Sequence, residues 1–195
     1  KFDNYIAQKN FAAQKATHDW VLNLDCDERL SPELRESILQ LKQSSPDKAG
    51  YKFNRLTWYI YRFIRHSGWY PDRKLRLFDR RLAQWGGQNP HDKIEMHASA
   101  RQARLRGDLL HYSYYTVEEH YARARKYADI AARAMYARGR RARWWNLALS
   151  PAVKWLRNYV FKAGFLDGRA GWTICRISAL ETGWKYSALR AMEKS

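Results

Sequence analysis

The sequence predicts an α/β fold that is followed by a helical, basic C-terminal region. Apolar positions among good helix formers predict a helix over residues 2–16. The short apolar run WVLNL, residues 20–24, is the pattern of a strand buried within a parallel sheet. A second helix is predicted to begin after Ser31, a good N-cap residue, with Pro32 in its first turn. An acidic loop, residues 25–28, joins the strand to this helix and completes one α/β unit.

Farther along the chain, composition predicts two more strands and a loop. Residues 50–60 are rich in Tyr, Phe, Thr and Trp, which favour strands. Residues 74–78 alternate basic and apolar side chains, as a half-buried strand does. Residues 86–90, GGQNP, predict a loop that leads into His91 and Asp92.

A long helix is predicted after Thr116. The sequence TVEE, residues 116–119, is a capping box, in which the first and last side chains satisfy free backbone donors at a helix start. Gly139 is expected to end this helix inside a basic run. Its apolar face is predicted to consist of Tyr121, Ala124, Ala128, Ala131 and Met135.

Composition limits the partners and the compartment. The 195 residues include 36 Lys and Arg against 19 Asp and Glu, so the net charge of +17 attracts phosphates on nucleic acid, anionic lipid or nucleotides. Cys26 and Cys175 match no metal or disulfide spacing, which suits a reducing cytosol. No uninterrupted apolar stretch of about 18 residues exists to predict a membrane span. The opening at Lys1, inside a predicted helix, favours a fragment or a start within a domain.

The acidic loop is the first candidate site. In a strand or extended loop, residues i and i+2 point to the same side, so Asp25 and Asp27 can converge on one point. Carboxylate oxygens at the end of a parallel strand suit Mg²⁺ or Mn²⁺. An EF-hand is excluded, because Arg29 and Leu30 occupy positions where that loop needs a ligand and a glycine. The alternative, solvated acids that cap the next helix, stays open.

Four segments of the sequence carry a family resemblance. QKNFAAQKATHDWVLNLDCDERLSPEL resembles the segment around the Asp-x-Asp motif of glycosyltransferases of family 2, which have the GT-A fold. WYPDRKLRLFDRRLAQWGGQNPHDKIE resembles their later Arg-Leu-Phe segment and the His-acid pair that follows it. HYSYYTVEEHYARARKYADIAARAM and FKAGFLDGRAGW are similar to the C-terminal half of one subgroup, the lipopolysaccharide-core β-glucosyltransferases.

This resemblance implies a domain organisation. The family begins with a strand, a helix and a strand that hold the nucleotide base, and these are absent ahead of the part that corresponds to Lys1. We therefore expect a GT-A-like mixed sheet, Rossmann-like and incomplete at its N-terminus. Residues 1–112 are expected to form this partial catalytic domain, and residues 113–195 a helical region rich in Trp and Arg.

The resemblance also implies a reaction, namely inverting transfer of a sugar from a nucleotide-sugar to a hydroxyl of a lipopolysaccharide-core or other glycan acceptor. The subgroup resemblance favours glucose from UDP-glucose. Mg²⁺ or Mn²⁺ would neutralise the leaving diphosphate, with Asp27 as its direct ligand and Asp25 nearer the sugar or ribose. His111 resembles a C-terminal histidine that contacts the metal in some GT-A enzymes; a hydrogen-bonded core histidine is the alternative. Asp92 matches the acidic member of the His-acid pair and is the expected general base, with Glu95 next.

The same resemblance places donors for the phosphates of the nucleotide-sugar. These residues are Lys9, Asn10, Arg76 and His91. The alternatives are that Lys9 and Asn10 are polar positions on a helix and that Arg76 is a solvated strand residue.

The C-terminal region mixes Trp and other apolar residues with Arg and Lys. Such a mixture suits a membrane interface, where aromatic rings lie at headgroup level and cations meet anionic lipid. A lipid-linked acceptor would place the enzyme peripherally on the cytoplasmic face of the inner membrane. A helical subdomain whose aromatic residues pack internally is the alternative.

Two other functions compete with the transferase. A basic, aromatic chain is also compatible with a nucleic-acid-binding module, although it carries no RNP motif, zinc spacing or basic zipper. A catalytically inactive, truncated transferase is the other alternative. The expected partners are a nucleotide-sugar donor, a lipid-linked glycan acceptor and an anionic membrane, with no nucleic acid.

Overall fold

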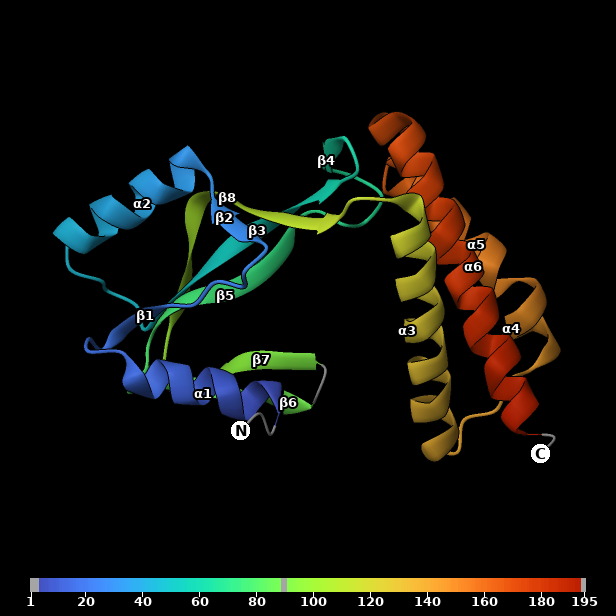
Figure 1. Ribbon diagram of the computed structural model, residues 1–195, viewed down its shortest axis with the longest axis horizontal. Coiled ribbons are helices and arrows are strands. Elements are labelled where there is room, and N and C mark those ends of the chain that lie inside the picture. Colours follow the sequence, from blue (N-terminus) through green and yellow to red (C-terminus); the bar gives the residue numbers. More distant parts are fainter. Residues whose placement is uncertain (1–3, 89–90, 194–195) are drawn as a thin grey trace. The chain divides into compact units, whose positions relative to one another are not determined.

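The computed structural model describes residues 4–88 and 91–193, and the predicted α/β fold with C-terminal helices is confirmed (Figure 1). The elements in chain order are α1 (Tyr5–Lys15), β1 (Trp20–Leu22), β2 (Glu28–Leu30), α2 (Pro32–Gln43), β3 (Gly50–Tyr59), β4 (Arg62–Ile64), β5 (Asp72–Asp79), β6 (Ala83–Gln88), β7 (His91–Met96), β8 (Gln102–Tyr114), α3 (Val117–Ala137), α4 (Trp144–Ala148), α5 (Ser150–Leu156), the π-helical turn η1 (Arg157–Phe161), the 3₁₀ turn η2 (Gly164–Asp167) and α6 (Gly168–Met192).

The chain divides into two compact units. The first contains Lys1–Leu56 and Asp72–His111, and the second contains Thr57–Pro71 and Tyr112–Ser195. Residues 57–71, which the sequence analysis assigned to the catalytic domain, thus group with the C-terminal helices.

The main sheet is mixed, as expected for a GT-A-like fold. Its strand order is β1-β5-β3-β8-β2, and β4 pairs with β3. The pairs β1–β5, β2–β8, β3–β4 and β3–β5 are antiparallel. In contrast, β3 and β8 run in the same direction, because backbone hydrogen bonds join Ala49 to Arg101 at one end and Ile60 to Tyr114 at the other.

The prediction that residues 20–24 form a strand buried in a parallel sheet is wrong in its surroundings. The strand β1 covers only residues 20–22, lies at the sheet edge and pairs antiparallel with β5. Leu22 is 37% exposed, whereas Trp20 and Leu24 pack against the core. A run this short shows that a strand is apolar but does not show which strand lies beside it.

The prediction of a loop over residues 86–90 is also wrong for its first part. Gly86 and Gly87 lie in β6, which pairs with β7 as an antiparallel hairpin. A Cβ at Gly86 would lie 2.4 Å from Glu95 Oε2, and Gly87 has a φ of +94°. Here the glycines permit a close approach and a left-handed backbone within a strand. Residues 89–90 lie outside the described residues.

The predicted second helix is confirmed as α2 and covers the sheet of the first unit. Ser31 Oγ accepts hydrogen bonds from Leu34 N at 3.2 Å and from Asp108 N at 3.0 Å, so one hydroxyl caps α2 and fastens it to β8. The helix then buries its apolar stripe in the sheet. The buried cluster consists of Leu34, Tyr51, Phe53, Leu77 and Leu109.

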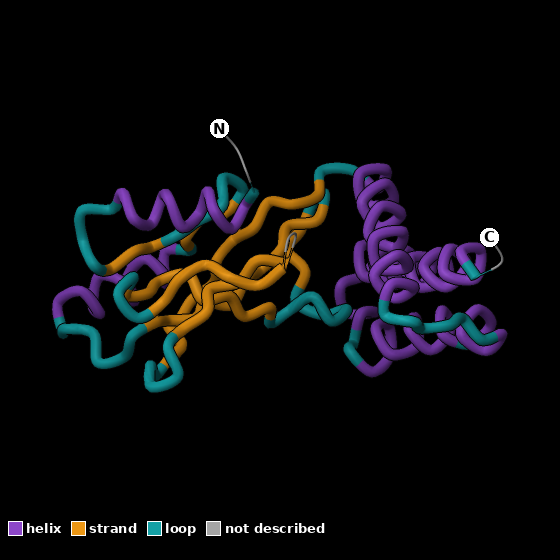
Figure 2. The backbone as a smooth tube through the Cα atoms, turned by 90° about the horizontal axis from the view of Figure 1, so that it is seen from below, coloured by secondary structure: helices purple, strands orange, loops and turns teal. Residues whose placement is uncertain are grey.

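In the second unit, α6 packs against α3, and Figure 1 shows these helices side by side. Figure 2 shows in purple that the C-terminal part of the chain is mostly helical. The predicted capping box is confirmed in its first half, since Thr116 Oγ1 accepts from Glu119 N at 3.1 Å. The Glu119 carboxylate accepts from the N–H of Tyr115, one residue before the N-cap, at 3.0 Å. The buried row of α3 is His120, Ala124, Ala128 and Ala132, which shares only two positions with the predicted face. None of the helices in the described part of the chain has both the length and the hydropathy needed to cross a membrane.

The buried carboxylate of Asp167 connects the β4 hairpin to the start of α6. It accepts hydrogen bonds from the backbone N–H groups of Arg65 at 3.3 Å and His66 at 2.9 Å, and from Ser67 Oγ at 3.3 Å. The Arg62 guanidinium donates to the Asp167 carbonyl oxygen at 3.1 Å. These contacts explain why residues 57–71 belong with the C-terminal helices.

Burial of His120 predicts a pH dependence of stability. Its ring contacts the Tyr59 hydroxyl at 3.1 Å, and burial, aided by the charge of Arg123, lowers the pKa of His120 from 6.5 to about 4. Between these values the unfolded chain binds a proton that the folded chain does not, so the free energy of unfolding decreases as the pH falls. We expect this residue to account for a loss of about 2 kcal/mol between pH 7 and pH 5.

Urea unfolding of the wild type and of His120→Gln at both pH values measures this loss, because other groups titrate equally in the two proteins. The variant should lose about 2 kcal/mol less than the wild type between pH 7 and pH 5. An equal loss in the two proteins would show that His120 already binds its proton in the folded state.

Candidate functional site

Helix α1 is fastened to the β6–β7 hairpin by Asn10. The Asn10 side-chain amide donates to the Trp85 carbonyl oxygen and accepts from the Trp85 N–H, each at 2.9 Å. This docking places the neighbouring Lys9 over the Trp85 ring, with its ammonium 4.2 Å from the ring centroid. Asn10 thus has a structural contact, and its predicted contact with phosphate stays a prediction.

Lys9 joins two carboxylates that are far apart in the sequence. Its ammonium donates to Asp92 Oδ2 at 2.7 Å and lies 3.3 Å from Asp25 Oδ1. The predicted base and one of the predicted donor-side acids therefore share a single cation. This cluster of Lys9, Asp25 and Asp92 is called the carboxylate site below.

The acidic loop is a turn and not an extended segment. Glu28 N donates to the Asp25 carbonyl at 3.0 Å, and Asp25 N donates to Glu28 Oε2 at 3.1 Å. The expectation that residues 25 and 27 follow the alternation of an extended chain is therefore wrong. The Asp25 carboxylate contacts Lys9 and Arg76, whereas the Asp27 carboxylate contacts His111.

Arg76 lies buried between two acids of this turn. One of its terminal nitrogens donates to Asp25 Oδ2 at 2.5 Å and to Glu28 Oε1 at 2.6 Å. Burial opposes the charge of Asp25, but the cations of Arg76 and Lys9 outweigh it, so the pKa of Asp25 lies below its usual value. Arg76 is 5% exposed, so the alternative of a solvated strand residue is wrong.

Asp27 faces His111 of β8. Asp27 Oδ2 lies 3.2 Å from His111 Nε2, and β2 pairs with β8 so that Glu28 is opposite His111. Burial, together with the charge of Arg55, lowers the pKa of His111 despite the nearby carboxylates. A neutral imidazole beside a carboxylate is the protonation state that metal coordination requires.

Asp27 and His111 lie close enough together to bind one divalent metal ion, and their predicted role at such a metal stays a prediction. Mg²⁺ commonly binds through one or two protein carboxylates together with the phosphates of a substrate, so a small protein donor set is sufficient. Within residues 4–88 and 91–193, no group of three or more His, Cys, Asp or Glu side chains is arranged to hold a metal ion. Asp25, the other predicted ligand, is instead paired with Lys9 and Arg76.

Sequence reasoning assigned no role to three residues that support this site. Glu28, whose side chain is fully buried, accepts a hydrogen bond from Arg76. The Trp85 ring lies under the Lys9 ammonium. Arg55 donates to Asp72 at 2.6 Å and lies 3.8 Å from Glu28. Glu28 could have been found as the third acid of the loop, whereas nothing local marks Trp85 or Arg55. His91 begins β7, and its side chain lies outside the described part of the structure.

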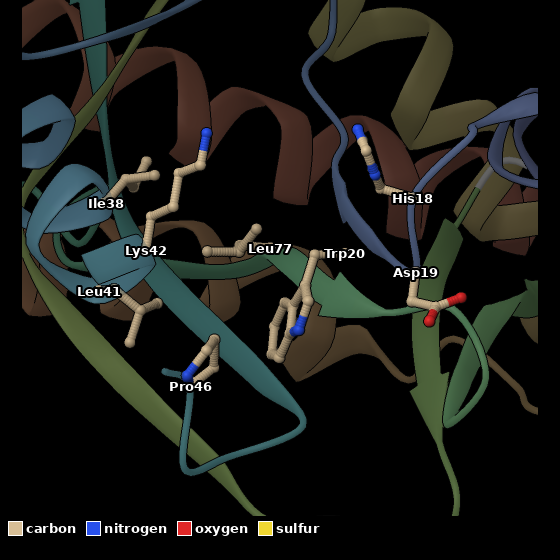
Figure 3. A pocket seen from close by; sticks show the side chains of 8 residues that line it. All are labelled: His18, Asp19, Trp20, Ile38, Leu41, Lys42, Pro46 and Leu77. Atoms are coloured by element: carbon tan, nitrogen blue, oxygen red, sulfur yellow. The ribbon is translucent and has the colours of Figure 1, made fainter. Parts of the chain in front are cut away.

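A separate hollow lies between α2 and the strands β1 and β5 (Figure 3). Its volume is about 520 Å³, and Trp20, Ile38, Leu41 and Leu77 give it a mainly apolar lining. None of the predicted site residues lines this hollow.

Comparison with known proteins places the chain among glycosyltransferases. It is 30% identical over 193 residues to the lipopolysaccharide core biosynthesis glycosyltransferase LpsC of Rhizobium meliloti, covering 96% of this chain and 67% of that protein. It is 24% identical over 197 residues to an uncharacterized glycosyltransferase of Rickettsia typhi, covering 96% of this chain and 68% of the relative. A similar uncharacterized glycosyltransferase of Rickettsia prowazekii is 24% identical over 195 residues, covering 95% and 67%.

Two other comparisons give no match. No family profile matches the chain, and no solved structure matches it. The α/β fold and the similarity over nearly the whole chain define a glycosyltransferase. The chain belongs to the glycosyltransferase family that includes LpsC.

The buried pair of Glu28 and Arg76 yields a stability prediction. Glu28→Gln should lower the free energy of unfolding by about 3 kcal/mol, because it leaves a buried guanidinium with one fewer counter-charge. The matched control is Asp19→Asn, which removes an exposed acid 3.0 Å from Arg81 and should cost less than about 1 kcal/mol. Urea unfolding at pH 7 measures both, and equal effects would mean that the buried pair contributes no more than a surface pair.

Proposed function

We propose that this protein transfers a hexose, glucose, from UDP-glucose to a hydroxyl of a lipopolysaccharide-core acceptor, with inversion at the sugar carbon. The observation that carries the proposal is the bridge of Lys9 between Asp25 and Asp92, which joins the expected donor side to the expected base. Membership of the family that includes LpsC supports the reaction class and favours it over a nucleic-acid-binding module.

The donor side of the proposed site is the acidic turn with its cations. Asp27 and His111 would hold Mg²⁺ or Mn²⁺, which supplies positive charge for the leaving diphosphate. Arg76 fixes Asp25 in place, and Lys9 carries a second positive charge on the same acid. His91 and Asn10 remain candidates for phosphate contacts on the family resemblance.

The acceptor side is Asp92. Its carboxylate takes the proton of the acceptor hydroxyl as that oxygen bonds to the anomeric carbon, while the bond from this carbon to the diphosphate oxygen breaks. A single displacement of this kind inverts the configuration and releases UDP. Lys9 positions Asp92 through the hydrogen bond at 2.7 Å.

The acceptor is proposed to be lipid-linked. LpsC carries lipopolysaccharide core biosynthesis in its name, and a core acceptor attached to lipid would require the protein to work at the cytoplasmic face of the inner membrane. Consumption of the donor tests the proposal as a whole. Full-length protein incubated with Mn²⁺, a core oligosaccharide and a panel of UDP- and GDP-sugars should release UDP from UDP-glucose, and release from no sugar nucleotide would overturn it.

Asp92→Asn should reduce kcat by a factor of about 100 to 10,000 while leaving the Kd for UDP-glucose unchanged, because only the proton acceptor is lost. Steady-state UDP release gives kcat, and calorimetry gives the Kd. The control is Asp47→Asn, which changes an exposed acid in the segment after α2 and should alter neither quantity. If Asp92→Asn retains wild-type turnover and Glu95→Gln does not, the base is Glu95.

Asp27→Ala should reduce kcat by about 100-fold or more and abolish the dependence of UDP binding on Mn²⁺, because a carboxylate beside the leaving diphosphate is removed. Calorimetric titration of UDP with and without Mn²⁺ measures the second effect independently of turnover. Wild-type metal dependence in this variant would remove Asp27 from the metal site.

A further inference from the structure

The helical stretch from α4 through η1 carries an apolar stripe on its exposed side. Leu149 keeps helical dihedral angles, φ −96° and ψ −34°, and accepts from Val153 N at 2.9 Å, so the turn between α4 and α5 continues the helical path. Residues spaced by four, four, three and four positions share one face of such a helix. These residues are Trp145, Leu149, Val153, Leu156 and Val160, and all are exposed.

The opposite side of the same stretch already supplies its packing. Trp155 and Tyr159 stack with their ring centroids 4.8 Å apart, and each lies 5.4 Å from Trp172 of α6. Asn158, which lies between these two residues in the sequence, is buried. The exposed stripe is therefore not the core-facing side of the helix, and its exposure to water is energetically unfavourable.

Further exposed apolar side chains follow the stripe along the chain. Phe161 is 78% exposed, and Phe165 and Leu166 of η2 are also exposed. The surface formed by the stripe and these three residues is called the interfacial surface. Ten of the exposed large hydrophobic residues of the described chain fall within residues 144–172, so this concentration is local.

The chain segment that carries the interfacial surface is basic. The sequence has no acidic residue between Asp129 and Asp167, and eight Arg and Lys residues lie in that interval. Arg140, Arg141 and Arg143 are exposed just before the stripe, and Arg143 lies 5.0 Å from the Trp145 ring centroid. Exposed aromatic and aliphatic side chains next to exposed cations match the headgroup region of a bilayer that contains anionic lipid.

We propose that the interfacial surface docks on an anionic lipid bilayer, with its apolar side chains at the boundary between headgroups and acyl chains. The inference rests on the proposed function only in making a membrane-linked acceptor the reason for docking. It goes beyond that function by assigning the docking to a defined helical surface in the second unit. The partner is the lipid surface itself, recognised through apolar insertion and negative charge.

The test is flotation of the full-length protein with vesicles of phosphatidylcholine alone or with phosphatidylglycerol added. The wild type should float with the anionic vesicles, less with neutral ones, and less again at high salt. The variant Leu149→Ser, Val153→Ser, Phe161→Ser should need at least tenfold more anionic lipid for half binding. The matched control, Phe11→Ser, Leu39→Ser, Leu82→Ser, removes three exposed hydrophobic residues of the first unit and should bind as the wild type does.

A charge variant provides an independent arm. The variant Arg140→Gln, Arg141→Gln, Arg143→Gln should also need at least tenfold more anionic lipid for half binding. Because it keeps the apolar side chains of the stripe, it tests the proposal even if the serine variant does not fold. Circular dichroism checks folding. The proposal is overturned if the wild type floats with neither vesicle, if it floats equally with both, or if both variants bind as the wild type does.

Two further measurements separate this proposal from others. If the surface instead joins two copies of the chain, light scattering will show a dimer that the serine variant dissociates, without flotation, and the membrane proposal fails. Transfer to a delipidated core oligosaccharide should be unchanged in the serine variant. A wild-type protein that transfers glucose but does not float would therefore refute docking alone, whereas a wild-type protein that floats but transfers no sugar would refute the proposed reaction alone.

Discussion

The buried guanidinium of Arg76 is the interaction on which the acidic turn depends. Taking carboxylates out of water is costly unless a cation with good geometry compensates them, and Arg76 meets both Asp25 and Glu28 with one nitrogen. The third acid, Asp27, is directed to His111 instead. Three acids can therefore stand within four positions because Arg76 and Lys9 compensate Asp25 and Glu28, while Asp27 has a separate partner in His111.

This division also explains how far the sequence could predict the site. Residue types and family resemblance identified Lys9, Asp25, Arg76 and Asp92, and the structure brings these four together in the first unit. What could not be predicted is which acid meets which cation, because those contacts join residues from α1, β5 and β7. The turn at residues 25–28 depends on reciprocal hydrogen bonds between Asp25 and Glu28, and no periodicity in the sequence reveals them.

The fold, like the site, could be predicted where local sequence signals are sufficient and not where contacts between distant residues decide the structure. Local signals such as the caps at Ser31 and Thr116 located α2 and α3 correctly, because a cap acts on neighbouring residues. Predictions failed where the adjacent strand in the folded protein determines how a segment pairs. The apolar run at Trp20 proved to be an edge strand. Gly86 lies in a strand at a position where a larger side chain would collide with Glu95 of the facing strand. The short strand β2 was missed because three residues are too few to show alternation.

Asp167 has a mechanical consequence for the second unit. This one carboxylate holds three successive residues after β4, while its own backbone ends η2 and leads into α6. Phe165 and Leu166 stand immediately before it. Whatever immobilises those two side chains therefore also holds the segment after β4, because the carboxylate of Asp167 ties that segment to the start of α6.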